Sequence, residues 1–322
     1  MSPTRTAHTV LGPVAADELG VIAAHESLLS IVPGAQYAYD IDIDRAEVFD
    51  ILRTKLLAFR AAGGGTVVDS AGMFHGRDLR LYENLSRSTG VHIIASTGMG
   101  PEEQLGGYFL TPQTNPPTPW PTEKFAALFA AEITEGMVAP RVERRGAAGM
   151  IVTAVTASGA TPTDESLLRG VGRASSETGV AAAVRFGADP VGELAIVLSE
   201  GTDPSRVLVG GLDRRDGAAS AHEIASRGAF VGIDHVGAAD DPALLTDEER
   251  LDLVAELVAA GHMQRIILSA GATGVAFGHV GTDLPFAHVL TDFAPRLLTR
   301  GIDAAAVETI LTANPRDLIA GR

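Results

Sequence analysis

The feature that most constrains the fold is a repeated alternation of short apolar runs and longer amphipathic stretches. The stretches at residues 45–63, 163–179 and 246–261 space their apolar side chains as a helix does, and several open on Thr or Asp and close on Gly. This alternation of strand and helix predicts a parallel sheet. The runs that have the composition of buried strands are residues 21–25, 66–70, 92–97, 150–155, 180–186, 207–212, 230–235 and 266–271.

The number of strand-like runs separates two parallel-sheet architectures. Eight runs favour closure into a (β/α)8 barrel, the TIM barrel, over an open doubly wound sheet. The glycine fingerprint of a dinucleotide-binding fold is absent after residues 21–25, which also disfavours the open sheet. Because barrels with long loops reach this length as one unit, we expect residues 1–322 to form a single domain.

Composition narrows the classes of partner. A net charge of −15 provides no cationic surface for nucleic acid or for an anionic membrane. The chain has no cysteine, so neither a disulfide nor a thiolate metal site can form. Residues 1–10 lack the apolar core of a signal peptide, and no apolar run is long enough to span a bilayer. We therefore expect a cytoplasmic protein whose partner is a small-molecule substrate.

Two connections are candidates for loops at the mouth of the barrel. Residues 98–120 hold most of the proline-rich stretch PQTNPPTPWP and the only tryptophan, Trp120. Long loops of this kind cover active sites in barrels, and Tyr108 and Trp120 favour a packed lid over an irregular surface insertion. The second loop, residues 272–286, contains Phe277. We predict substrate contacts from Tyr108, Trp120 and Phe277.

Several stretches, in order along the whole chain, are similar to one known family. They include GVIAAHES at 20–27, VVDSAGMFHGRD at 67–78, GAFVGIDHVG at 228–237 and TANPRDLI at 312–319. In these stretches the chain resembles the phosphotriesterase family of the amidohydrolase superfamily. The resemblance implies a (β/α)8 barrel that hydrolyses phosphotriesters, lactones or esters with two divalent metal ions at its mouth. By family analogy it also implies a homodimer.

The resemblance further implies a metal ligand set from which this chain departs. That set is a His-x-His pair, a carboxylated lysine, two more histidines and an aspartate. His25 matches the first histidine, whereas the other family positions hold Ser27, Val152 or Thr153, Arg185, Gly211 and Gly271. A guanidinium about 4 Å from a divalent ion would cost about 8 kcal/mol at an effective dielectric near 20. We therefore expect a divergent member with no metal and no cofactor, in which Arg185 replaces the metal charge.

Barrels place catalytic groups at the carboxyl ends of their strands, where this chain has His25, Arg185, Asp213 and His235. The two histidines are candidate acid and base groups, and the alternatives are a hydrogen-bonded core role for His25 and a pocket-wall role for His235. Strand alternation predicts that Glu26 and Asp234 point away from the mouth. The other histidines, in predicted loops or helices, restore no metal cluster; they include His75, His222, His262, His279 and His288.

Arg185 is the sharpest candidate, because a cation at a barrel mouth requires an anion. We predict that it pairs with Asp213 or Asp69 and also contacts an anionic substrate. Asp69 and Thr97, which end two strands, are further predicted substrate contacts.

Three functions follow from these residues. The first is a metal-independent enzyme, a lyase, isomerase, cyclase or ester or lactone hydrolase that uses acid and base histidines. The second is a non-catalytic relative that binds a small molecule or a protein in the pocket where the family has its active site. The third is a conventional metal-dependent hydrolase, which the missing lysine and aspartate disfavour. Convergence of Arg185, His25 and His235 in one pocket would favour the first function, and a plugged mouth would favour the second.

Overall fold

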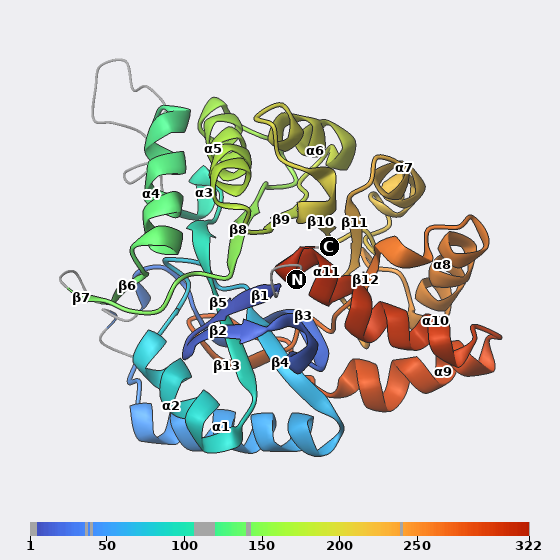
Figure 1. Cartoon of the computed structure of the whole chain (residues 1–322), viewed down its shortest axis with the longest axis horizontal. Coiled ribbons are helices and arrows are strands. Elements are labelled where there is room, and N and C mark those ends of the chain that lie inside the picture. Colours follow the sequence, from blue (N-terminus) through green and yellow to red (C-terminus); the bar gives the residue numbers. More distant parts are fainter. Residues whose placement is uncertain are drawn as a thin grey trace.

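The computed structural model describes residues 5–35, 38, 41–105, 120–139, 143–238 and 241–321. Strands of one sheet form its centre, and helices surround them on the outside (Figure 1). The neighbouring strands of this sheet, in spatial order, are β13 (Thr273–Phe277), β3 (Val21–Ile31), β4 (Gly64–Asp69), β5 (His92–Met99), β8 (Met150–Ala154), β9 (Ala182–Arg185), β10 (Val207–Gly210), β11 (Phe230–Ile233) and β12 (Ile266–Leu268).

All pairings within this sheet are parallel, and from β3 to β12 the spatial order follows the chain. The chain runs from β12 through residues 269–272 into β13, which pairs with β3. The Ser27 N–H also donates to the Ala272 carbonyl oxygen at 3.0 Å. β12 and β13 thus act together as the eighth strand and close the predicted (β/α)8 barrel, so the predicted fold class is confirmed.

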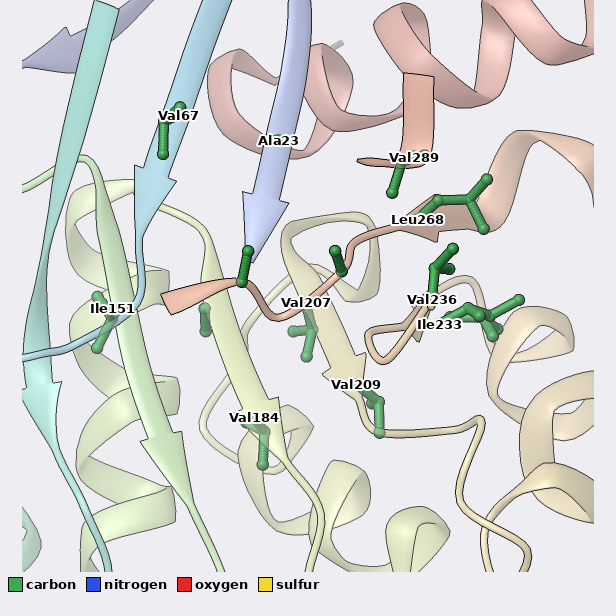
Figure 2. Packing of buried hydrophobic residues seen from close by; sticks show 14 of the residues in the cluster. Ala23, Val67, Ile151, Val184, Val207, Val209, Ile233, Val236, Leu268 and Val289 are labelled. Atoms are coloured by element: carbon green, nitrogen blue, oxygen red, sulfur yellow. The ribbon is translucent and has the colours of Figure 1, made fainter. Parts of the chain in front are cut away.

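Two hydrophobic clusters show how the side chains alternate along the strands. On β9 and β10, Ala183 and Leu208 belong to the cluster inside the barrel, whereas Val184 and Val209 belong to the cluster between strands and helices. Figure 2 shows the second cluster, in which Val184, Val209 and Ile233 come from three neighbouring strands. Both faces of the sheet are therefore buried, which explains why the strands are continuous apolar runs in the sequence.

The helices follow the predicted amphipathic stretches. Asp44 caps the first long helix, and Thr161 and Thr246 form capping boxes at the start of two others. The helices have these bounds: α1 (Arg45–Ala61), α2 (Leu79–Thr89), α3 (Glu102–Leu105), α4 (Thr122–Thr134), α5 (Pro162–Thr178), α6 (Pro190–Leu198), α7 (Ala221–Ser226), α8 (Asp247–Ala259), α9 (Ala294–Thr299), α10 (Ala304–Glu308) and α11 (Asn314–Ala320). Across the described ranges, none of them has the length and apolarity needed to span a bilayer.

Both ends of the chain lie at the amino-terminal end of the barrel. Strands β1 (Thr6–Thr9) and β2 (Gly12–Ala15) form an antiparallel hairpin that the sequence patterns do not predict. Ala7 of this hairpin packs in the inner cluster together with Leu318 of α11. Arg5 Nη1 lies 3.0 Å from Asp317 Oδ1, which ties the two ends together. A second short hairpin joins β6 (Val138–Ala139) and β7 (Glu143–Arg144).

Candidate functional site

Two cavities open at the carboxyl ends of the barrel strands. Cavity A, of about 190 Å³, extends toward β4, β5 and β8 and is lined by residues that include Ser70, His75, Met99, Gln104 and Thr153. Cavity B, of about 290 Å³, lies toward β11 and the residues around β13 and is lined by residues that include Asp234, His235, Thr273 and His279. Both cavities share His25, Ser27, Ser30 and Arg185. Among the described residues, which do not include 106–119 of the predicted mouth loop, the mouth is therefore open and polar rather than plugged.

An irregularity in β3 decides which side chains face this mouth. Ile22 and Ala24 face the inside of the barrel, so plain alternation would turn the next residue, His25, outward. The register between β3 and β4 shifts between Ala23 and Glu26, as at a β-bulge. The shift brings His25 to the wall of both cavities, as predicted.

Glu26 occupies the seam where the barrel closes. Its carboxylate accepts a hydrogen bond from Ser269 Oγ at 2.7 Å, a second from the Ala270 N–H at 3.3 Å and a third from the Ala272 N–H. Burial raises the pKa of Glu26 to about 8, although these hydrogen bonds oppose the increase. Glu26 thus joins β3 to residues 269–272 and also lines cavity B, so the prediction that it points away from the mouth was wrong.

The prediction for Asp234 was wrong. Alternation along β11 places Phe230 inside the barrel and continues through Gly232 to Asp234, which therefore faces inward. Asp234 Oδ2 accepts a hydrogen bond from the Gly211 N–H at 2.7 Å and lies 3.6 Å from His25 Nδ1. A side chain at Gly210 would place its Cβ 2.4 Å from Asp234 Oδ2, so only glycine leaves room for this carboxylate.

His25 and Asp234 form the electrostatic centre of the mouth. Burial lowers the pKa of His25, the Asp234 carboxylate opposes this change, and the Arg185 cation reinforces it. Two of their atoms, His25 Nδ1 and Asp234 Oδ1, are buried and have no hydrogen-bond partner among the described residues. Such atoms are available to a bound molecule.

His235 is held by a chain of buried charges. The ring nitrogen Nδ1 of His235 lies 2.7 Å from Asp213 Oδ1, and the backbone N–H of His235 donates to Asp213 Oδ2. Arg250 Nε donates to the same Oδ2 at 2.8 Å, and both Arg250 and Asp213 are fully buried. Burial opposes ionisation of Asp213, but hydrogen bonds from His235 and Arg250 outweigh it and lower the pKa of Asp213 to about 2. Asp213 thus orients His235 from behind the cavity, and the sequence had not indicated Arg250.

Arg185 ends β9 and lines both cavities. The predicted internal ion pair was wrong. Asp213 is occupied by His235 and Arg250, and Asp69 Oδ1 accepts a hydrogen bond from the Leu28 N–H at 2.8 Å. Within the described part of the chain, no carboxylate lies within ion-pair distance of the Arg185 guanidinium. The guanidinium therefore faces the cavities as a cation without a protein partner among those residues.

Four of the predicted substrate contacts do not line cavity A or cavity B. Asp69 and Thr97 are buried and line neither cavity, since alternation turns them toward the helices. Burial raises the pKa of Asp69 to about 7. Phe277 packs against the outer cluster beside β3, and Trp120 packs on Phe125 of α4 with ring centroids 5.5 Å apart. The structure thus corrects these four predictions, and Tyr108 lies outside the described residues.

Two histidines that sequence reasoning set aside belong to the mouth. His75 follows β4 and lines cavity A, and His279 follows β13 and lines cavity B. Burial lowers the pKa of His75. Ser30 Oγ lies 2.8 Å from His279 Nε2. The signal that could have found both residues is their place in loops that directly follow barrel strands.

A larger cavity of about 530 Å³ lies beside α1 and α2. Its charged groups already have partners, because Arg77 Nη1 is 2.6 Å from Glu132 Oε2 and Arg45 Nη2 is 2.7 Å from Asp78 Oδ2. Size alone therefore does not identify the site. The unpartnered groups of the mouth are the better indication of ligand binding.

The two metal ions that the resemblance implies would require a cluster of ligand atoms at the mouth. Only Asp247, His288 and Asp292, among the described residues, bring three candidate ligand atoms within 4.8 Å of one another. Asp247 in that group already pairs with Arg250 and Arg296, and the group does not line cavity A or B. The described side chains of the mouth therefore fit a binuclear metal centre poorly.

Comparison with known proteins agrees with this fold. A family model described as "Phosphotriesterase family" matches residues 5–319. The chain is 28% identical over 281 residues to an N-acetyltaurine hydrolase of Tetraodon nigroviridis, covering 83% of this chain and 76% of that protein. It is 26% identical over 266 residues to an aryldialkylphosphatase of Saccharolobus solfataricus, covering 79% of this chain and 80% of that protein.

A solved structure is similar over almost the whole chain. The organophosphorus hydrolase from Deinococcus radiodurans superposes with a TM-score of 0.84 at 25% identity and covers 99% of this chain and 98% of its own. Since the family model spans the barrel from the first hairpin to α11, the chain is a member of the phosphotriesterase family.

Proposed function

We propose that this protein is a metal-independent enzyme that binds a small anionic substrate through Arg185 and transfers protons with His25 and His235. The observation that carries the proposal is the Arg185 guanidinium, which faces both cavities and has no ion-pair partner among the described residues. An arginine in such a position favours a carboxylate or phosphate, which its planar fork can bind through two hydrogen bonds.

The same arginine disfavours a divalent ion in the mouth. Arg185 and His25 line the same cavities, and a cation at this point repels any ion bound there. At about 4 Å the repulsion would be about 8 kcal/mol at an effective dielectric near 20. No protein ligand set of the mouth compensates for this cost.

Proton transfer is assigned to two imidazoles in different settings. His235 has its Nδ1 engaged by Asp213, which leaves Nε2 for a substrate. His25 lies 3.6 Å from Asp234 Oδ2, and burial lowers its pKa, so the neutral base form is favoured. Two imidazoles that line one cavity beside an arginine suit general acid–base catalysis of an anionic substrate.

The reaction class is the finer part of the proposal. Relatives named N-acetyltaurine hydrolase and aryldialkylphosphatase favour hydrolysis over a lyase, isomerase or cyclase reaction. A similar solved structure, named a PTE-like lactonase from Deinococcus radiodurans, favours a lactone or ester as the substrate. Without a metal ion, water or another nucleophile must be activated by a protein base, which limits the substrate to activated acyl compounds.

Binding of simple anions tests the proposal before any substrate is known. Acetate, succinate and inorganic phosphate are titrated by calorimetry into the wild type and Arg185→Ala. We expect at least about a 10-fold weaker dissociation constant in the variant for the anion that binds most tightly, which corresponds to about 1.4 kcal/mol.

Arg215→Ala is the matched control, because Arg215 is exposed and lies 2.8 Å from Glu249 at a distance from both cavities. It should bind each anion as the wild type does. Equal affinities in the wild type and Arg185→Ala, with both proteins folded by circular dichroism, would overturn the anion-binding role.

A further inference from the structure

A hydrogen-bonded pair of a serine and a histidine lies at the rim of the mouth. Ser30 is near the end of β3, and His279 lies just beyond the end of the neighbouring strand β13. The distance from Ser30 Oγ to His279 Nε2 is 2.8 Å, which is the length of a good hydrogen bond. The strand pairing, in which Ser30 lies opposite Ala276, holds the two side chains together.

The environment of His279 determines which of its nitrogens carries the proton. His279 Nδ1 lies 3.1 Å from the carbonyl oxygen of Val280. A carbonyl oxygen can only accept a hydrogen bond, so Nδ1 is the protonated nitrogen. Nε2 then has a free lone pair and accepts the hydrogen bond from the Ser30 hydroxyl. The Ser30 hydroxyl, the His279 imidazole and the Val280 carbonyl oxygen are therefore hydrogen-bonded in sequence, as a nucleophile, its base and the group that orients the base are.

Ser30 also has access to substrate. It lines both cavity A and cavity B, together with Arg185, and is only partly buried. A substrate whose anionic group meets Arg185 can present its carbonyl carbon to Ser30 within the same space. His75, which lines cavity A, is a further neutral imidazole at this wall, because burial lowers its pKa.

We propose that Ser30 is a nucleophile, that His279 is its general base, and that the substrate is an ester or lactone of a small carboxylic acid. Ser30 Oγ bonds to the carbonyl carbon while its proton passes to His279 Nε2. The C–O bond to the leaving alcohol then breaks, and His279 returns the proton to that oxygen. Water, deprotonated by His279, releases the acid from Ser30 and restores both residues.

This inference deepens the proposed function and rests on it for the cavities as the substrate site. It assigns the proton transfers at Ser30 to His279, whereas His25 and His235, which line cavity B with Ser30, keep the proton transfers at the other atoms of the substrate. It supplies the nucleophile that hydrolysis without a metal ion needs. The chemistry differs from attack by a metal-bound hydroxide, because it passes through a covalent ester on Ser30. A covalent reagent can therefore detect it in the absence of the substrate.

Phenylmethylsulfonyl fluoride is the probe. Ser30 Oγ would form a bond to sulfur, fluoride would leave, and His279 would take the proton. Intact-mass spectrometry of the full-length protein should show one sulfonyl adduct, and peptide mapping should place it on Ser30. Ser30→Ala should give no adduct. His279→Gln should form the adduct at least about 100-fold more slowly than the wild type, as loss of a general base predicts.

A second serine–histidine pair provides the matched control. Ser226 Oγ lies 3.5 Å from His262 Nε2, on the exposed surface between α7 and α8. Ser226→Ala should form the adduct at the wild-type rate. Absence of an adduct in the wild type, an adduct on another residue, or equal rates in the wild type and Ser30→Ala would each overturn the inference, provided that circular dichroism shows folded protein.

The two proposals can fail separately. Ser30→Ala retains Arg185, so it should bind acetate, succinate and phosphate as the wild type does. No adduct on Ser30 in the wild type, together with the expected weaker anion binding in Arg185→Ala, would overturn the nucleophile alone. An adduct on Ser30 together with unchanged anion binding in Arg185→Ala would overturn the anion site alone.

Discussion

Two arginines at the mouth of this barrel have opposite surroundings. Arg250 is fully buried, and its guanidinium donates to Asp213 and Asp247. Arg185 faces two cavities and has no carboxylate at ion-pair distance among the described residues. The buried cation is satisfied by the protein, whereas the cavity-facing cation is not. The difference separates a residue that maintains the site from a residue that awaits a ligand.

Two buried carboxylates, Asp213 and Glu26, also differ in whether an arginine is bound to them. Hydrogen bonds from His235 and Arg250 overcome the effect of burial and hold the pKa of Asp213 at about 2. Glu26, on the side of Arg185, has hydroxyl and backbone donors but no arginine beside it, and burial raises its pKa to about 8. The pKa values of these two carboxylates thus differ in direction according to whether an arginine donates to them.

The largest expected effect is on the free energy of unfolding, which should depend strongly on Arg250 and weakly on Arg185. Arg250→Met should lower the free energy of unfolding by about 3–5 kcal/mol, because it leaves Asp213 as an uncompensated buried charge. Arg185→Met should change it by no more than about 0.5 kcal/mol, since that side chain is exposed to the cavities. Urea denaturation followed by circular dichroism measures both values.

Arg215→Met controls for the loss of an arginine as such. Its ion pair with Glu249 is solvent-exposed, and such pairs contribute about 0–1 kcal/mol. If Arg185→Met lost as much stability as Arg250→Met, the division between the two arginines would be wrong.

The pH dependence of stability should reflect the two carboxylates. The raised pKa of Glu26 means that its stabilising contribution is complete below about pH 4.5 and is lost as the pH rises toward 8. The contribution of Asp213 is present above pH 3.8 and is lost as the pH falls toward 2. Denaturation midpoints between pH 3 and 9 should therefore fall at both ends.

Glu26→Gln should reduce the loss of stability on the alkaline side, to which Asp69 with its raised pKa of about 7 also contributes, and leave the acid side unchanged. Asp213→Asn should do the reverse. A profile that Glu26→Gln does not alter would show that Glu26 is ionised at neutral pH in the folded protein.

A smaller effect tests the position of Arg185 relative to His25. Arg185→Met should raise the pKa of His25, because the nearby cation disfavours the protonated imidazole. Asp234→Asn should lower it, because the carboxylate favours that form. Proton NMR of the imidazole gives both titrations, with Arg215→Met as the variant that should change neither. Shifts of the same sign in the two variants would contradict this arrangement.

No effect is expected from metal removal. Treatment with EDTA followed by gel filtration should leave the thermal midpoint and the phenylmethylsulfonyl fluoride reaction unchanged, since a cation faces the cavities where metal ligands would be needed. Elemental analysis of protein grown with zinc and manganese should give near zero metal per chain. One or two equivalents per chain, or a large fall in the midpoint, would contradict the metal-independent function.

Much of the fold could be predicted because it depends on local pattern. The run at residues 230–235 is apolar because both faces of its strand are buried, and that property is written in consecutive residues. The hairpin of β1 and β2 was missed, because its short strands are stabilised by packing on α11 rather than by their own pattern.

The site was predictable in part. His25 lies within β3, Arg185 ends β9 and His235 follows β11, and each lines a cavity, as expected from their positions. Alternation misplaced Asp234, because the prediction counted back from His235 and the strand had already ended at Ile233. His279 was set aside since its partner, Ser30, lies far from it in the chain.

The sequence by itself determined the eight-strand barrel and the family to which the chain belongs. It also led to the expectation that Arg185 stands where the family has a metal ligand. Only the tertiary structure decided which charges are neutralised within the protein. Asp213 is bound by Arg250 of α8, and this leaves Arg185 facing the cavities. Strand pattern is a property of neighbouring residues, whereas ion pairing depends on distances that exist only after the barrel closes.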